Sequence, residues 1–254
     1  INISIHGQTL NPGLKQFTHQ DTLRGSITPE RAWWDLNYYH LDISVNPKTN
    51  DARISGSLAS LCGLEKAKAW NNAGEIENAL RKIILMQAHS MFMGGIPMLY
   101  YGDEMAYTND YSYLNDPGKN YDNRWMHRPI IDWNKNEQRK KKGSLEYRIF
   151  NETKQLIQIR KALPILSDFS NVTWMTPHNI HVASFIRSFE DKKLFCLFNY
   201  QPANSFVTWY TFKEHGIRPA QLKDHWTGLT HNVGNDNEFF ILGGYQFAIL
   251  EVIS

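Results

Sequence analysis

The stretch Gly94-Gly95-Ile96-Pro97-Met98-Leu99-Tyr100-Tyr101-Gly102-Asp103-Glu104 decides the predicted fold. Before it, residues 75–92 carry apolar side chains at helical spacing, and the glycine pair ends this predicted helix. Residues 96–101 then form a run that is apolar on both sides of an extended chain. A helix that leads into a strand buried on both faces is typical of a parallel sheet. We therefore predict a strand over residues 96–101 inside an α/β domain.

Two carboxylates follow this predicted strand. In a (β/α)8 barrel, the carboxyl ends of the strands form the active-site face. Adjacent residues of a strand point to opposite faces, so Asp103 and Glu104 are not expected to flank one bond together, as an acid and a nucleophile must. We expect them to have a structural role at the active-site face, bracing loops through hydrogen bonds.

The pattern changes along the chain near residue 166. Before it we predict helices over residues 55–69, 75–92 and 145–162 and a long polar, aromatic-rich loop over residues 109–136. After it, short β-rich runs alternate with turn residues, which is typical of an antiparallel sandwich. We expect strands near residues 172–175, 181–187, 194–200, 205–212, 239–242 and 247–253. A short strand over residues 1–5 is a further expectation.

Composition narrows the classes of function. The chain has 254 residues with a formal net charge of +2, which gives no field for nucleic acid or an anionic membrane, and we expect neither as a partner. Its cysteines, Cys62 and Cys196, are too few for a disulfide framework or a thiolate metal site and favour a cytoplasmic protein. No histidine pattern indicates a metal site, and no glycine-rich phosphate loop occurs. We expect neither a metal nor an organic cofactor.

Several motifs in order carry a family resemblance. Residues 95–104 resemble the eighth-strand motif of glycoside hydrolase family 13, the α-amylase family. Residues 46–61 and 122–129 are similar to the amylosucrase branch of that family. Residues 147–164 resemble the last barrel helix, and residues 243–251 resemble the closing β-strand. The resemblance covers about residues 46–254 and implies the C-terminal end of a (β/α)8 TIM barrel over residues 1–166, with 1–45 unassigned, followed by a β-sandwich domain over residues 167–254.

The resemblance implies a parent enzyme that transfers or hydrolyses α-glucosyl groups with retention, acting on sucrose or an α-glucan. Such enzymes use an aspartate nucleophile, a glutamate acid/base and a third carboxylate that stabilises the oxocarbenium-like transition state. The segments that carry the nucleophile and the acid/base are not found in this chain. We therefore expect the chain alone to be inactive and the missing N-terminal half of the barrel to be its partner.

The resemblance also suggests individual site residues. Asp21, in Phe17-Thr18-His19-Gln20-Asp21, is the candidate for the third carboxylate, and a surface loop aspartate is the alternative. Arg124 matches an arginine that helps to close the glucosyl pocket by pairing with a carboxylate, expected here in the N-terminal half. Structural pinning of the loop is the other interpretation of Arg124. Tyr101 and Trp125 are candidates for stacking on substrate, and packing is the alternative for both.

A non-enzymatic function stays open beside the enzymatic one. The chain is then a degenerate amylase relative that persists as a carbohydrate-binding or interaction module. In that hypothesis the aromatic loop over residues 109–136, with Tyr113 and Trp125, forms the binding surface.

Overall fold

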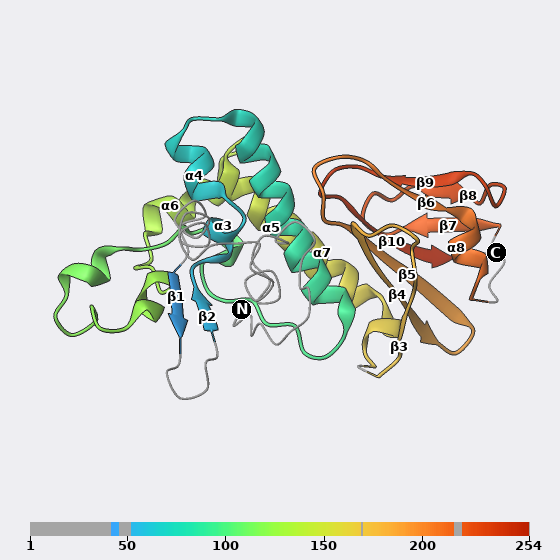
Figure 1. Cartoon of the computed structure of the whole chain (residues 1–254), viewed down its shortest axis with the longest axis horizontal. Helices are drawn as coiled ribbons and strands as arrows, with labels where there is room; N and C mark the ends of the chain where they lie inside the picture. The colour runs from blue at the N-terminus through green and yellow to red at the C-terminus, as the bar shows by residue number, and fades with distance from the viewer. Residues whose placement is uncertain (1–41, 46–51, 169, 216–219, 254) are drawn as a thin grey trace, which may run out of the picture. The chain divides into compact units, whose positions relative to one another are not determined.

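The computed structural model describes residues 42–45, 52–168, 170–215 and 220–253 of the chain (Figure 1). The chain forms two compact units. The first contains residues 1–83 and 99–151, and the second contains residues 84–98 and 152–254. The predicted strand at residues 1–5 and the candidate Asp21 lie outside the described residues. In the ranges that are described, none of the helices is long and apolar enough to cross a membrane.

The first unit begins with the two-stranded antiparallel sheet of β1 (Asp42–Val45) and β2 (Ala52–Ser55). Two short helices follow, α3 (Leu58–Leu61) and α4 (Leu64–Ala69). The prediction of one helix over residues 55–69 is therefore wrong. Gly63 separates the two helices with a φ of +87°, a left-handed conformation that glycine adopts at low cost and that interrupts the helical hydrogen bonds.

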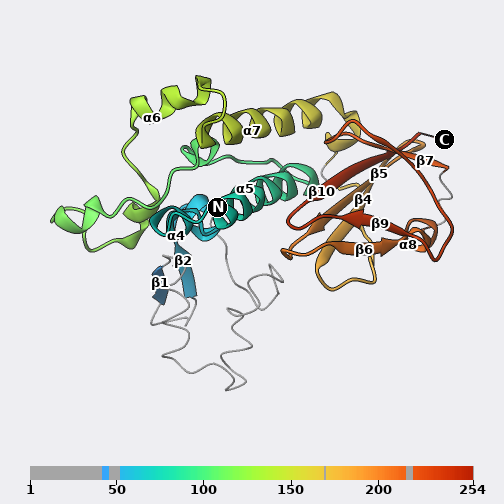
Figure 2. The same cartoon turned by 90° about the horizontal axis from the view of Figure 1, so that it is seen from above.

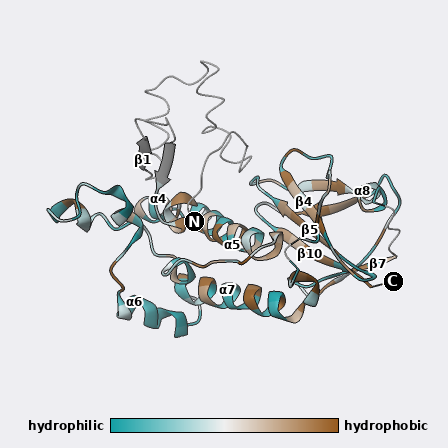
Figure 3. Cartoon of the chain, turned by 90° about the horizontal axis from the view of Figure 1, so that it is seen from below, coloured by the Kyte–Doolittle hydropathy of each residue, from teal (hydrophilic) through white to brown (hydrophobic). Residues whose placement is uncertain are grey.

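The two long helices agree closely with the predicted ranges. They are α5 (Ala73–Met93) and α7 (Leu145–Ala162). Asn72 accepts a hydrogen bond from the Glu75 amide at the start of α5, and Ser144 accepts one from the Tyr147 amide at the start of α7. Hydrophobic and hydrophilic residues alternate along α7 in Figure 3, as expected for a helix with one buried side.

Helices α5 and α7 run in the same direction. In the first unit, Arg148 of α7 pairs with Glu77 of α5. In the second unit, the buried Thr153 hydroxyl donates to Gln87 Oε1 at 2.6 Å. The contacts therefore advance toward the carboxyl end on both helices. Parallel neighbouring helices require a connection that returns along their length, and residues 94–101 belong to that connection.

The predicted strand over residues 96–101 is wrong for the described structure. The segment belongs to no helix or strand, and it is exposed where the sequence predicts burial: Ile96 is 91% and Met98 is 78% exposed. A strand exists only where a neighbour shares its hydrogen-bond ladder, and no described segment pairs with this one. Every strand pairing in the described ranges is antiparallel, so a parallel sheet is not present there.

The long loop contains several short helical turns. They are, in chain order, η2 (Asp103–Met105), η3 (Ser112–Asn115), η4 (Asn123–His127), α6 (Trp133–Glu137) and η5 (Gln138–Lys140). The sequence carries no periodic signal for elements of this length, and their turns are set by local side-chain caps such as Asp122 and Asp132.

A six-stranded antiparallel sheet dominates the second unit, in the order β3-β4-β5-β10-β7-β8. The short turn η6 (Pro164–Leu166) precedes it. Its strands are β3 (Val172–Trp174), β4 (Val182–Phe189), β5 (Lys192–Asn199), β7 (Gln221–Asp224), β8 (Thr230–Asn232) and β10 (Phe247–Val252). A second sheet pairs β6 (Ser205–Thr208) with β9 (Phe239–Leu242), side by side in Figure 2.

The six-stranded sheet is buried on both faces. One face packs on the β6–β9 sheet and on α8 (Trp209–Lys213) through a single apolar core. The other face packs on the carboxyl-terminal half of α5, where the His89 ring stacks on Phe198 at 4.7 Å. This double burial explains the apolar run Leu194–Phe198 on β5. The core between the sheets consists of Met175, Val182, Ile186, Phe195, Leu197, Val207, Trp209, Phe212, Leu222, Phe240, Leu242, Ala248 and Leu250.

Most of the predicted strands after residue 166 are confirmed. The strand predicted over residues 205–212 is wrong in its second half, because the chain turns into α8 at Trp209. The side chains of Trp209 and Phe212 enter the core from this helix, which periodicity over so few residues does not reveal. The sequence did not predict β7 and β8, which are short strands at one side of the sheet.

Candidate functional site

Tyr100 brings the two most specific motifs of the chain together in the first unit. Its ring lies 4.7 Å from that of Tyr101, its neighbour in the motif at residues 95–104. On another side, the Tyr100 ring meets the His127 ring edge-on at 5.8 Å, and His127 belongs to the motif at residues 122–129. Residues almost thirty positions apart therefore form one aromatic cluster, which we call the tyrosine cluster: Tyr100, Tyr101 and His127.

The tyrosine cluster combines an accessible ring with a desolvated imidazole. Tyr101 is 45% exposed, which leaves part of its ring accessible to a ligand. Partial burial, followed by the neighbouring Tyr100, raises the Tyr101 pKa, so its hydroxyl stays protonated at neutral pH. His127 is half-buried, and burial, reinforced by the adjacent Arg128, lowers the pKa of its imidazole. Its Nδ1 is buried without a hydrogen-bond partner.

Arg124 is oriented by a carboxylate of its own loop. Its Nε donates to Asp122 Oδ1 at 2.8 Å, and its Nη2 donates to Asp122 Oδ2 at 2.8 Å, so the pair is bidentate. Asp122 also accepts from the Arg124 backbone amide, and these bonds lower its pKa to about 2. The Arg124 side chain is 61% exposed. The structure thus pairs Arg124 with Asp122, where the sequence predicted a carboxylate from outside the chain.

Trp125 is held between cationic neighbours. The Lys119 Nζ lies 5.2 Å from the Trp125 ring centroid, and the Arg128 guanidinium carbon lies 4.9 Å from it. Both distances are typical of cation–π contacts. Because Lys119 also pairs with Asp116 at 2.9 Å, the tryptophan helps to fix the loop. The packing interpretation of Trp125 is thus the one for which this structure shows contacts.

Hydrogen bonds fix the beginning of the long loop to α3. The Ser57 amide donates to Asn109 Oδ1 at 2.7 Å, and the Asn109 amide donates to the Ser60 hydroxyl at 3.0 Å. The Ser60 hydroxyl in turn donates to Glu65 Oε2 at 2.5 Å. Further along, the Ser55 hydroxyl donates to Asn123 Oδ1 at 3.0 Å. These bonds join the motif at residues 46–61 to the loop that carries Arg124.

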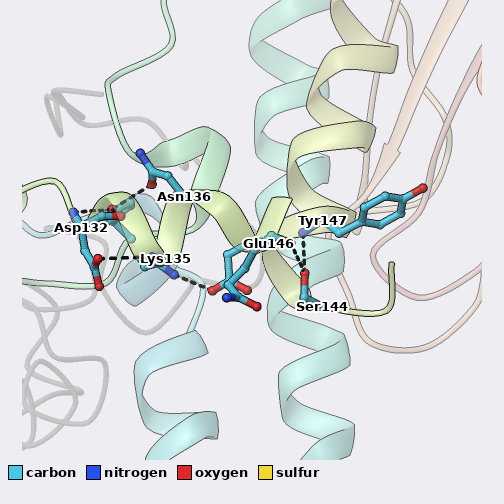
Figure 4. A network of polar contacts seen from close by, with 8 residues as sticks. Asp132, Lys135, Asn136, Ser144, Glu146 and Tyr147 are labelled. Carbon is cyan, nitrogen blue, oxygen red and sulfur yellow. Dashed lines mark hydrogen bonds and ion pairs between the residues drawn. The ribbon is translucent and has the colours of Figure 1, made fainter. Parts of the chain in front are cut away.

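A second network fixes the end of the loop, shown in Figure 4. Asp132 accepts from the Lys135 amide at 3.2 Å at the start of α6, and Lys135 Nζ pairs with Glu146 at 2.7 Å. The Tyr107 hydroxyl accepts from the Asp132 amide at 2.8 Å and donates to Asn136 Oδ1 at 2.9 Å. A loop closed at both ends in this way presents its middle part in a fixed conformation.

Asp103 and Glu104 lie in the turn η2, not at the end of a strand. Asp103 is buried, and this burial raises its pKa to about 6, with a smaller contribution from Glu104. Glu104 Oε2 accepts a hydrogen bond from the Gly102 amide at 2.8 Å. Gly102 has a φ of +93°, a conformation that favours glycine, and a Cβ there would lie 3.2 Å from that of Tyr107. Glu104 thus stabilises a tight turn of its own backbone.

The structure changes the view of the remaining aromatic residues. Tyr113 is 6% exposed, so it offers no ring face to a ligand, contrary to its proposed place in a binding surface. Tyr100, Asn109 and Asp122 organise the site, and sequence reasoning missed all three. Tyr100 stood in a run interpreted as a buried strand, and Asp122 is an ordinary loop residue by any sequence pattern. Within the described ranges, no group of three His, Cys, Asp or Glu residues has metal-binding geometry.

Comparisons with known proteins support the fold. No protein-family profile matches the chain. It is similar to a variant of AmyP in complex with maltotriose, with a TM-score of 0.54 and 17% identity over 70% of this chain and 35% of that one. For AmyP in complex with maltose, the TM-score is 0.51 and the identity 16% over 69% of this chain and 35% of that one.

A weaker similarity links the chain to the α-amylase of Geobacillus thermoleovorans complexed with acarbose, with a TM-score of 0.49 and 16% identity over 71% and 35% of the two chains, and we base no argument on it. The chain spans about a third of the length of these structures. At such identities the similarity shows the fold alone. The described residues form antiparallel sheets with helices, and this arrangement matches the C-terminal region of amylase-like enzymes of the α-amylase family.

Proposed function

We propose that the chain is the C-terminal part of an amylosucrase-like enzyme that transfers or hydrolyses α-glucosyl groups with retention. In this proposal residues 1–166 complete a (β/α)8 barrel and residues 167–254 form its C-terminal β-sandwich domain. The nucleophile and the acid/base belong to an N-terminal half of the barrel, and sucrose or an α-glucan is the substrate. No step of this chemistry needs a metal or an organic cofactor.

The unpaired segment at residues 96–101 is the observation that carries the proposal. It is extended, it presents Ile96 and Met98 to solvent, and it lies between the parallel helices α5 and α7 in the chain. Helix, extended segment and helix in this order match the repeating unit of a parallel barrel from which the adjacent strands are absent. Apolar side chains exposed to this degree on an edge without a partner favour pairing with another segment.

The tyrosine cluster and the loop indicate where substrate contacts the chain. In a barrel, loops at the carboxyl ends of strands line the active site, and the tyrosine cluster follows directly on the proposed strand. Arg124 is exposed and oriented by Asp122, so its remaining guanidinium surface is presented in a fixed direction. We propose that Arg124 and Tyr101 contact the glucosyl group. Asp103 and Glu104 support the turn beneath them, and Asp21 is the proposed third carboxylate.

The decisive experiment compares the 254-residue chain with the polypeptide found in its source. An antibody against residues 145–162 reports the denatured mass of that polypeptide. We expect a mass of at least about twice 29.6 kDa. We also expect fructose release from sucrose by the long polypeptide and none by residues 1–254 alone. Robust fructose release by the isolated chain would refute the proposed division of catalytic residues.

The contribution of Arg124 is tested in the long polypeptide. Arg124→Ala is expected to raise KM for sucrose at least tenfold, because the side chain that closes the pocket is lost. Arg81→Ala is the matched control: Arg81 is also partly exposed and paired with a nearby carboxylate, Glu77, but lies on α5 away from the loop. An unchanged KM in the Arg124 variant would remove Arg124 from the proposed site.

A further inference from the structure

The outer face of the β6–β9 sheet is apolar and exposed. Phe206 stands directly opposite Ile241 in the register, and Thr208 stands opposite Phe239. The exposed fractions of Phe206, Phe239 and Ile241 are 49%, 51% and 55%, whereas the alternate residues Val207, Phe240 and Leu242 are buried in the core. We call Phe206, Thr208, Phe239 and Ile241 the outer patch.

The rings of the outer patch support each other. Phe206 and Phe239 are diagonal neighbours across the two strands, and their ring centroids are 5.8 Å apart in an edge-to-face arrangement. Both strands are anchored from below, because their inward residues belong to the core of the second unit. The two rings are therefore held by a rigid sheet, so little conformational entropy would be lost when a ligand contacts them.

The chemistry of the outer patch favours a neutral ligand. None of its four side chains carries a charge, and its polar groups are the Thr208 hydroxyl and, at the strand edge, Asn179. Asn179 Nδ2 donates to the Phe206 carbonyl oxygen at 3.3 Å, and the side chain is partly exposed. An apolar ring surface beside a hydroxyl and an amide suits the face of a pyranose ring, which presents C–H groups surrounded by hydroxyls.

The size of the outer patch argues against a protein partner. An aromatic side chain has about 200 Å² of surface, so half exposure leaves roughly 100 Å² for each large residue and roughly 300 Å² in all. A stable protein–protein interface buries about 800 Å² on each partner. The outer patch is too small for that, and it is large enough for two or three sugar rings. An α-glucan is the neutral polymer that the proposed function supplies.

We propose that the outer patch is a non-catalytic binding site for α-1,4-linked glucan, with Phe206 and Phe239 stacking on the sugar rings. This inference rests on the proposed function for the choice of sugar. It adds a site in the second unit, on a strand pair that shares no residue with the tyrosine cluster or with Arg124. Such a site would hold the enzyme on its polymeric substrate without taking part in the reaction.

The test is a calorimetric titration of residues 1–254 with maltoheptaose. We expect measurable binding, weakened about tenfold by Phe206→Ala and by Phe239→Ala, since each removes one stacking ring. Trp174→Ala is the matched control, because Trp174 is 61% exposed on the edge strand β3, outside the outer patch, and its removal should leave the affinity unchanged. Far-UV circular dichroism confirms that each variant is folded.

The possible results separate this inference from the proposed function. Absent binding, or binding that both phenylalanine variants retain, overturns the inference even if the long polypeptide transfers glucose. A dimer in analytical ultracentrifugation that Phe206→Ala dissociates also overturns it, since a second copy is then the occupant. Binding that is lost in both variants supports the inference even if the long polypeptide shows no glucosyl transfer.

Discussion

Replacing Arg187 is expected to destabilise the second unit strongly. Arg187 lies on β4 and is fully buried, with a relative exposure of 0%. Its Nη1 donates to the Phe92 carbonyl oxygen at 2.7 Å, its Nε donates to Asn171 Oδ1 at 2.6 Å, and its Nη2 donates to the Asp168 carbonyl oxygen. One guanidinium thus satisfies three acceptors from three separate segments.

The location of Phe92 explains why this contact matters. Phe92 lies in the last turn of α5, where helix carbonyls have no amide partner within the helix and carry the negative end of the helix dipole. Arg160 of α7 caps the same end by donating to the Met91 carbonyl oxygen and, at 3.0 Å, to that of Gly95. Arg187 and Arg160 therefore attach the end of α5 to the sheet and to α7.

The magnitude follows from the acceptors that lose their donor. A buried acceptor left unsatisfied costs about 1–3 kcal/mol, so three acceptors cost several kcal/mol. Part of this is offset because Arg187→Met no longer buries a cation, whose desolvation also costs several kcal/mol. We expect the free energy of unfolding to fall by about 3 kcal/mol. With a urea dependence of about 2 kcal/mol per M, the midpoint of unfolding falls by about 1.5 M.

Urea unfolding followed by far-UV circular dichroism measures this change. Arg187→Met has nearly the same length as arginine, so the loss reports the hydrogen bonds more than a cavity. Arg187→Lys should give a smaller loss, because one ammonium group cannot reach three divergent acceptors. Arg124→Met is the control: it removes an exposed arginine, and its midpoint should equal that of the unchanged protein. A midpoint for Arg187→Met within 0.2 M of the unchanged protein, on the order of experimental error, would refute the reasoning.

Two further predictions concern pH. Burial raises the Asp103 pKa to about 6, so ionisation destabilises the folded chain; the stability of Asp103→Asn relative to the unchanged protein should therefore rise by about 2–3 kcal/mol from pH 4 to pH 6 in urea titrations, and a flat difference would contradict the burial of this carboxyl. Burial lowers the His89 pKa to about 4, and His89 Nδ1 pairs with the Tyr200 hydroxyl, so the advantage of His89→Gln should instead grow as the pH falls from about 6.5 to about 4; a slope of the same sign as that of Asp103→Asn would disprove it.

The sequence predicted the elements whose signal is periodic. Helices α5 and α7 repeat apolar residues over five or six turns, and most strands of the six-stranded sheet alternate or are bounded by turn residues. Such patterns arise because a long element must bury one face or stripe whatever its neighbours are. Shorter elements lacked that signal. Gly63 divides a predicted helix in two, and α8 replaces half of a predicted strand.

The candidate site shows the same division. The motifs at residues 95–104 and 122–129 were recognisable in the sequence, but their contact through Tyr100 and His127 was not. Nor could the sequence show that Asp122 would orient Arg124, that Trp125 would lie between Lys119 and Arg128, or that Tyr113 would be buried. Side-chain partners in a long loop depend on how the loop closes, and loop closure leaves no periodic pattern.

What the sequence determined by itself is the order of elements and the division between a helical part and a β-rich part, because local periodicity and turn residues encode both. Only the tertiary structure decided which faces are covered. Residues 96–101 are as apolar as a buried strand requires, yet they are exposed here, because burial and strand pairing need a partner that no local pattern can supply. The outer patch became visible for the same reason: alternation predicts one inward and one outward face, and packing alone determines that the outward face of β6 and β9 carries Phe206, Phe239 and Ile241 without a cover within the described chain.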